Sequence, residues 1–169
     1  GPNWKIAYDG YMDLYHLPIL HKETFGPQMP CQALYYAWGP HQRVSSPDPR
    51  LAMLVEQPED EWSDDVLLGG VWTIFPHISI ATFEGGGRSV MVSQLFPGAT
   101  PQESFTVQNY LMAREPDESQ AREAREQFDL LKYVVEEEDY ATGLKQQQSL
   151  MTGTRDHVLF GRNEGGGHR

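Results

Sequence analysis

Hydrophobic and polar positions in the middle of the chain follow the pattern of β-strands. The runs VLLGGVWTIFPHISIATF (66–83) and RSVMVSQLFPG (88–98) are rich in β-branched and aromatic residues, and the glycine-rich segment 84–87 separates them. They predict an antiparallel hairpin. Residues 104–113 (SFTVQNYLMA) alternate between two faces, which predicts a further strand. One of these faces carries Phe105, Val107, Asn109 and Leu111.

After Asp117 the pattern changes from a period of two to steps of three and four residues. This spacing is typical of an amphipathic α-helix. Asp117 suits the N-cap position, with Gln120 three residues later as its capping partner. We expect the helix to end at about residue 137 and to pack its apolar stripe against the concave face of the sheet. The stripe consists of Ala121, Ala124, Phe128, Leu131 and Val135.

The remaining segments complete an α+β outline. Residues 31–40 (CQALYYAWGP) predict a short strand that ends at a Gly-Pro pair. Residues 41–65 contain three prolines and an acidic run, and we expect a surface loop there. Residues 143–153 are interpreted as a short helix or turn, and residues 164–169 as a flexible end. Strands bracketed by helical segments, without βαβ alternation, predict an α+β fold with an antiparallel sheet.

Size, charge and cysteine content narrow the classes of protein. A chain of 169 residues with 39% hydrophobic residues suits one compact domain. A formal net charge of −11 disfavours binding to nucleic acid. There is neither an apolar run long enough to span a membrane nor a signal-peptide pattern at the start, so we expect a cytoplasmic protein without membrane contact. Cys31 is the one cysteine, which excludes an internal disulfide and a cysteine-ligated iron–sulfur cluster built from this chain.

The segment NWKIAYDGYMDLYHLPILH (3–21) concentrates ionisable side chains among apolar and aromatic neighbours. It contains Asp9, Asp13, His16 and His21. The apolar flanks indicate that these groups point inward, where a polar group costs free energy unless it is paired. A metal ion is one partner that fits such a group, and a pair of hydrogen-bonded core histidines is the alternative.

The spacing of the two histidines restricts how they can meet. In an uninterrupted α-helix of about 100° per residue, His16 and His21 would point roughly 140° apart and would not share one ion. Pro18 lies between them and is expected to kink or break the helix, which allows the imidazoles to approach. Asp13, three residues before His16, is placed to orient that imidazole. Two histidines, one further carboxylate and open positions form the facial triad of non-haem Fe(II) oxygenases, whereas four closed ligands would indicate structural zinc.

The same segment carries a family resemblance. Its carboxylates and histidines match DxxxDxxHxxxxH, flanked by NWK and YHLPILH, and resemble the mononuclear iron motif of Rieske-type aromatic-ring-hydroxylating oxygenases, in the catalytic domain of their α subunit. Three later segments resemble the same family in the same order: GGVWTIFPHISIATF, QLFPGATPQES and EEEDYATGLKQQQSL. The resemblance implies that residues 1–169 are a single catalytic domain with the helix-grip fold. In this fold a curved antiparallel sheet wraps a long C-terminal helix, with the substrate pocket beside the iron.

The resemblance also implies several reaction partners. Family members use O2 to hydroxylate an aromatic or other apolar substrate, with electrons passed from a reductase or ferredoxin through a Rieske [2Fe-2S] centre. Asp13 takes the family role of a bridge from a ligand histidine to the Rieske centre of the neighbouring subunit in a homotrimer. Asp9 is expected either to cap the opening helix or to stabilise that interface. Because a Rieske centre needs two Cys and two His, we expect no Rieske domain in this chain and no turnover by the chain alone.

The third metal ligand is expected at the end of the amphipathic helix. The segment VVEEEDYATG offers Glu136, Glu137, Glu138 and Asp139, and the helix-grip arrangement returns it to the iron. Asp139 is the expected ligand, because it stands eight residues before Gln147 in the register of the family's ligand aspartate and has the shorter side chain. The predicted Fe(II) ligands are therefore His16, His21 and Asp139. A solvated acidic run is the alternative for this segment.

Two other classes of function remain open on the sequence. A helix-grip module that holds an apolar ligand without catalysis would share the fold, and a metal-dependent hydrolase would share the His and Asp cluster. Metal content separates the three: iron favours the oxygenase, zinc the hydrolase and no metal the binding module. The remaining histidines have no spaced partners, so surface or packing roles are expected for His41, His77, His157 and His168.

Overall fold

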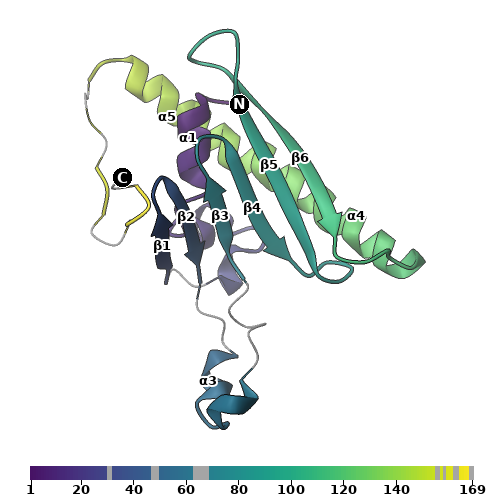
Figure 1. Cartoon of the computed structure of the whole chain (residues 1–169). Coiled ribbons are helices and arrows are strands. Elements are labelled where there is room, and N and C mark those ends of the chain that lie inside the picture. Colours follow the sequence, from purple (N-terminus) through teal and green to yellow (C-terminus); the bar gives the residue numbers. More distant parts are fainter. Residues whose placement is uncertain are drawn as a thin grey trace.

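The computed structural model describes residues 1–29, 32–46, 50–62, 69–154, 157, 159–161 and 164–167. Within this part of the chain, six strands form one antiparallel sheet in which each strand pairs with its neighbours in sequence. Figure 1 shows the long C-terminal helix crossing one face of this sheet. The strands are β1 (Leu34–Trp38), β2 (His41–Ser45), β3 (Val71–Ile74), β4 (Ile78–Phe83), β5 (Ser89–Pro97) and β6 (Ser104–Met112).

Helical segments precede, interrupt and follow the strands. None of the helices in the described ranges is long and apolar enough to cross a membrane. The architecture confirms the α+β class and is consistent with a helix-grip fold. The short segments are α1 (Trp4–Gly10), α2 (Leu17–Leu20), η1 (Gly26–Gln28), α3 (Leu51–Leu54) and η2 (Glu59–Glu61). The long C-terminal helix consists of α4 (Glu118–Tyr133), the π-helical η4 (Val134–Tyr140) and α5 (Ala141–Met151), which follow one another without a break.

The long helix begins where the sequence predicts. The Asp117 side chain accepts the N–H of Gln120 at 2.9 Å, and the Gln120 side chain accepts the N–H of Asp117 at 3.0 Å, which completes a capping box. The predicted apolar stripe is buried or half-buried along its whole length. The helix ends later than expected, at Met151, because η4 and α5 continue it. The segment interpreted as a short helix or turn is thus the last part of the same helix.

Two expectations for the strands are wrong in part. Within the run 66–83, expected as one strand, β3 and β4 fold back on each other around Pro76, which has no N–H to donate within a strand. Residues 66–68 lie outside the described ranges. The expected loop, residues 41–65, contains β2 and α3. Strand β2 is short and polar, and its pairing with both β1 and β3 supplies stability that its composition does not indicate.

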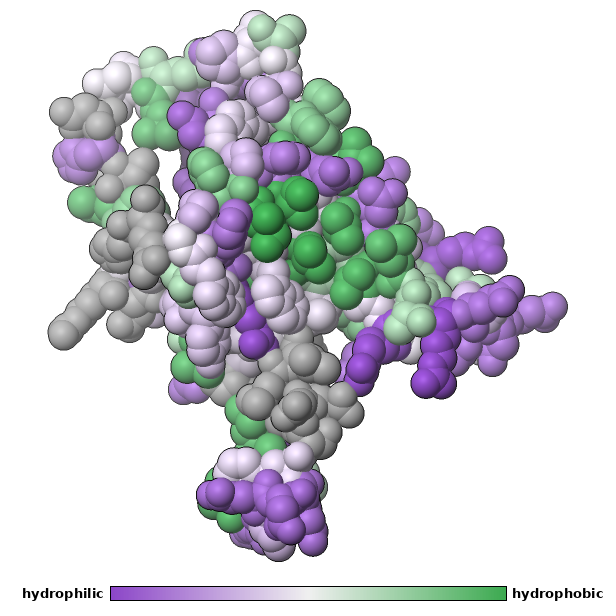
Figure 2. All heavy atoms as spheres, in the orientation of Figure 1, coloured by the Kyte–Doolittle hydropathy of each residue, from purple (hydrophilic) through white to green (hydrophobic). Residues whose placement is uncertain are grey.

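The two faces of the sheet differ in polarity. A polar row crosses five strands in register on the inner face and consists of Gln42, Thr73, Ser79, Ser93 and Gln108. The first four members of this row are buried. The outer face exposes large apolar side chains on β3 and β6, and Figure 2 shows hydrophobic residues gathered over the strands. The alternation in β6 is therefore correct, with its more polar face turned inward.

The N-terminal segment is fastened between the sheet and the long helix. The amino group of Gly1 donates to the carbonyl oxygen of Ser104 at 2.7 Å, and the N–H of Ser104 donates to the carbonyl oxygen of Gly1 at 3.1 Å. Asn3 caps α1 by accepting the N–H of Lys5, so the first of the two roles expected for Asp9, capping the helix, is wrong. Asp9 is exposed near the end of α1. Helix α1 then packs on β5 in a core cluster with Leu95. These contacts bring the residues after α1 to the middle of the long helix.

Candidate metal centre

His16 and His21 stand at the two ends of the four-residue helix α2. His16 is the residue before its first turn, and His21 is the residue after its last. Pro18 occupies the first turn of α2, where a missing N–H is tolerated, so it helps to start a short helix and does not kink a long one. The two imidazole centroids lie 5.0 Å apart, with ring planes inclined by 73°. The histidines therefore meet across the two ends of one short helix, and the kink or break expected at Pro18 is not found.

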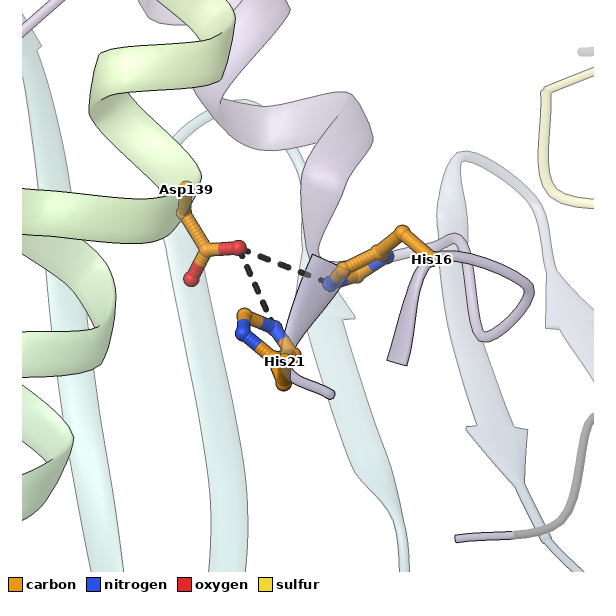
Figure 3. A group of neighbouring side chains, drawn as sticks. All are labelled: His16, His21 and Asp139. Carbon is orange, nitrogen blue, oxygen red and sulfur yellow. Dashed lines mark ion pairs between the residues drawn. The ribbon is translucent and has the colours of Figure 1, made fainter. Parts of the chain in front are cut away.

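Asp139 joins the two histidines from the long helix. Its Oδ1 atom lies 3.3 Å from Nε2 of His21 and 3.5 Å from Nε2 of His16 (Figure 3). The three candidate donor atoms all lie within 4.8 Å of one another. No other group of at least three metal-ligating side chains is found within the described ranges. Two imidazole nitrogens and one carboxylate oxygen thus face a common point.

The π-helical turn η4 decides where Asp139 points. A π-helix closes its hydrogen bonds one residue later than an α-helix, and such turns are frequent at functional sites. The inner side of η4 is anchored by the buried residues Val134 and Val135. Two consecutive side chains of the turn then reach the same imidazole: Glu138 Oε2 lies 2.6 Å from Nδ1 of His21, and Asp139 Oδ1 lies near its Nε2. His21 is held between adjacent carboxylates.

Asp13 lies beside His16, on the far side from Asp139. Its Oδ2 atom is 3.4 Å from Nδ1 of His16, and its Oδ1 atom accepts the N–H of Tyr15 at 2.7 Å. Burial acts to raise the pKa of Asp13, but the hydrogen bonds from His16 and from the Tyr15 N–H outweigh it, so the pKa lies below its ordinary value. Asp13 is therefore a carboxylate that contacts a candidate ligand and faces away from the group of three.

The surroundings of His21 favour a cation. The side chain is 1% exposed and stacks on the ring of Phe25, with centroids 4.9 Å apart. Burial acts to lower the pKa of His21, yet the hydrogen bonds to Asp139 and Glu138 raise it above its ordinary value. A buried imidazole between two carboxylates is stabilised by added positive charge, either a proton or a metal ion.

Most of the predicted site residues meet at one place. The structure brings His16, His21 and Asp139 together and sets Asp13 beside them. The sequence did not indicate that Glu138 contacts Nδ1 of His21, because adjacent residues of an α-helix point about 100° apart. In the structure both carboxylates contact one ring from a π-helical turn. The run of acidic residues was the one feature of the sequence that could have indicated a second carboxylate at the site. Of the other histidines, those within the described ranges take no part in the group, and His168 lies outside those ranges.

Comparison with protein families gives the class of this site. Residues 1–169 match the family described as ring hydroxylating alpha subunit (catalytic domain). The chain therefore belongs to this family of ring-hydroxylating oxygenases. The comparison with curated proteins gave no match. Family membership and the His, His, Asp group point to the same kind of metal-dependent oxidation chemistry.

Proposed function

We propose that this chain is the mononuclear iron domain of a Rieske-type oxygenase, which hydroxylates an aromatic or other apolar substrate with O2. His16, His21 and Asp139 would bind Fe(II). The observation that supports the proposal most strongly is the convergence of their donor atoms within 4.8 Å in a chain that belongs to the ring-hydroxylating family.

The donor set fits Fe(II). Two imidazoles and one carboxylate are the facial triad of non-haem iron oxygenases, which leaves open positions, whereas structural zinc sites close all four positions. Fe(II) bound there would supply O2 activation. The protein's own contribution is to fix the ligands: Asp13 contacts Nδ1 of His16, and Phe25 covers one face of the His21 ring.

We further propose that electrons reach the site from a [2Fe-2S] centre outside this chain. The sequence has one cysteine, and a Rieske cluster needs two. Asp13, whose side chain is 35% exposed, is the proposed point of entry, because it contacts solvent on one side and a candidate ligand on the other. A Rieske domain with its reductase or ferredoxin, in a homotrimer of the full-length protein, would be the partner. The lone cysteine fits a reducing compartment, so we place the reaction in the cytoplasm.

Metal analysis tests the ligand assignment. The chain is loaded anaerobically with Fe(II), desalted and assayed for iron, with His16→Ala as the ligand variant and His41→Ala as a control at a histidine outside the group. We expect about one iron per chain in the wild type and in the control, and loss of iron in His16→Ala. Full iron occupancy in His16→Ala would refute the assignment. Selective retention of zinc would favour the hydrolase, and binding of neither metal would favour the ligand-binding module.

Turnover tests the electron supply. With an aromatic substrate, NADH and a reductase, the iron-loaded chain should form no product beyond a single turnover. Hydrogen peroxide, which is O2 already reduced by two electrons, should bypass the need for external electrons. Sustained NADH-driven product formation by the purified chain would contradict the proposal.

A further inference from the structure

Glu138 closes a small hydrogen-bonded network behind His21. Its Oε2 atom lies 2.6 Å from Nδ1 of His21 and 3.2 Å from the hydroxyl oxygen of Thr24. The same Thr24 hydroxyl lies 3.1 Å from the carbonyl oxygen of His21, so its single proton is shared between two acceptors. The Glu138 side chain is 14% exposed. The network is therefore largely shielded from water, and every member of it contacts His21 or its backbone.

The direction of the hydrogen bond fixes the form of the imidazole. An ionised carboxylate only accepts hydrogen bonds, so the proton in the contact with Glu138 belongs to Nδ1 of His21. A neutral imidazole that carries its proton on Nδ1 has its lone pair on Nε2. Nε2 is the nitrogen that faces Asp139 and the common point of the candidate site. The contact therefore selects the tautomer that can donate to a metal.

We propose that Glu138 is a positioning residue, which holds His21 with its Nε2 lone pair directed at the metal and does not itself bind the ion. The inference rests on the proposed function, since it requires a metal at His16, His21 and Asp139. Carboxylates that accept from the second nitrogen of a metal-bound histidine orient the ring and raise its basicity, and their removal typically weakens metal binding about 10- to 100-fold.

Both histidines have a carboxylate at Nδ1, but the two contacts differ in strength. Asp13 faces Nδ1 of His16 as Glu138 faces Nδ1 of His21, and both Nε2 atoms face Asp139. The contact of Asp13 is 3.4 Å long, and its side chain is 35% exposed. The contact of Glu138 is 2.6 Å long and shielded. Because water screens the first contact more than the second, Glu138 is the stronger of the two supports.

The acidic run supplies a matched control for an experiment. Glu137 and Glu138 are neighbours of equal charge, but Glu137 is exposed and belongs to none of the contacts around His21. Glu138→Ala removes both charge and acceptor, and Glu138→Gln removes the charge while its amide oxygen can still accept from Nδ1. Glu137→Gln removes the same charge from the same turn. Thr24→Val removes only the hydroxyl that supports Glu138.

Calorimetric titration of the full chain with Co(II) alone measures the effect. We expect Glu138→Ala to weaken Co(II) binding about 10- to 100-fold, Glu138→Gln and Thr24→Val to weaken it less, and Glu137→Gln to change it by less than about twofold. A second readout is specific to the tautomer: in the Zn(II)-loaded protein, the slowly exchanging Nδ1 proton of His21 should give a proton NMR signal in the wild type and in Glu137→Gln, and lose it in Glu138→Ala.

The possible outcomes separate this inference from the proposed function. If the wild type binds neither Co(II) nor Zn(II), the metal site and the inference both fail. If the wild type binds metal and both Glu138 variants retain full affinity and the Nδ1 signal, only the inference fails. If Glu138→Gln abolishes binding as completely as Asp139→Ala, Glu138 is a ligand, and the positioning role is wrong. Circular dichroism spectra verify that each variant keeps its helical content.

Discussion

The surroundings of His16 and His21 differ although the two residues belong to one short segment. His16 is 21% exposed, and its second nitrogen faces Asp13, three residues earlier in the chain. His21 is 1% exposed, and its second nitrogen faces Glu138, 117 residues later. One histidine is thus supported locally at the surface, and the other by tertiary structure in the interior. The difference teaches that one binding site can combine two kinds of contact. One kind, between residues close in sequence, is visible in the sequence, and the other, between residues far apart in sequence, forms only when the chain folds.

The largest expected effect is at Asp139, the carboxylate that contacts both histidines. Asp139→Ala should weaken metal binding by more than about 100-fold, beyond the usual effect of an outer carboxylate, because it removes the proposed ligand that contacts both histidines. Glu137→Ala should leave the affinity unchanged. Titration with Fe(II) under anaerobic conditions measures both. The reverse result would place the ligand at Glu137 and show that the assigned register is off by two residues.

Alanine substitution of His16 and of His21 should lower the free energy of unfolding by different amounts, because the surroundings of the two side chains differ. Both variants should lose metal, but in the metal-free protein His21→Ala should lower the free energy of unfolding by about 3 kcal/mol, because it leaves a cavity and a shielded carboxylate without its partner. His16→Ala should lower it by about 1 kcal/mol or less, as expected for a partly exposed contact. Urea denaturation measures the difference. Equal losses would mean that the two surroundings are energetically alike.

Asp13→Asn tests the local half without removing a ligand. The variant should keep most of its iron, with affinity reduced by less than about tenfold, because Asp13 contacts His16 on the side away from the metal. Electron transfer from a separately supplied Rieske partner should slow, and stopped-flow absorption of the cluster measures it. An unchanged rate of cluster oxidation would show that electrons enter elsewhere.

The smallest expected effect concerns Tyr35, which lies on the Asp13 side of the site. Burial raises the pKa of Tyr35 to about 12, and Asp13, Tyr15 and Glu164 add to the rise. The folded state therefore favours the neutral phenol. Its contribution to stability is complete below the unfolded pKa of about 10 and is lost as the pH rises towards 12. Unfolding free energies measured between pH 9 and 12 should fall less steeply in Tyr35→Phe. An identical slope would refute the assignment.

The parts of the fold that the sequence predicted are those with strong local patterns. Strands β5 and β6 and the start of α4 at Asp117 follow directly from alternation, helical period and capping chemistry. Strand β2 could not be predicted, because its five polar and apolar residues are stabilised by partners on both sides. The burial of the sheet faces could not be predicted either, since a buried row of serine, threonine and glutamine crosses the inner face while large apolar side chains of β6 face outward.

The same division applies to the site. The pattern of Asp13, His16 and His21 could be recognised in the sequence, and the structure sets these residues side by side. Asp139 was chosen by family register, and it lies with the histidines; its role as a ligand stays a prediction. The contact between Glu138 and His21 could not be predicted from an α-helical period, because Glu138 lies in a π-helical turn that the residue types in VVEEEDY do not indicate.

The π-turn also makes the length of the chain at this point as important as its composition. A π-helical turn holds one residue more than an α-helical turn, so deleting one residue would allow η4 to close as a regular α-helix while α4 and α5 stay close to their present register. Within the shortened turn, Glu138 and Asp139 would no longer be placed to contact the two nitrogens of one imidazole. We therefore expect homologues to differ in this segment by substitutions and not by deletions. The exposed Glu136 and Glu137 should vary most freely. A homologue one residue shorter here would need carboxylates at other positions of the turn to make the same contacts.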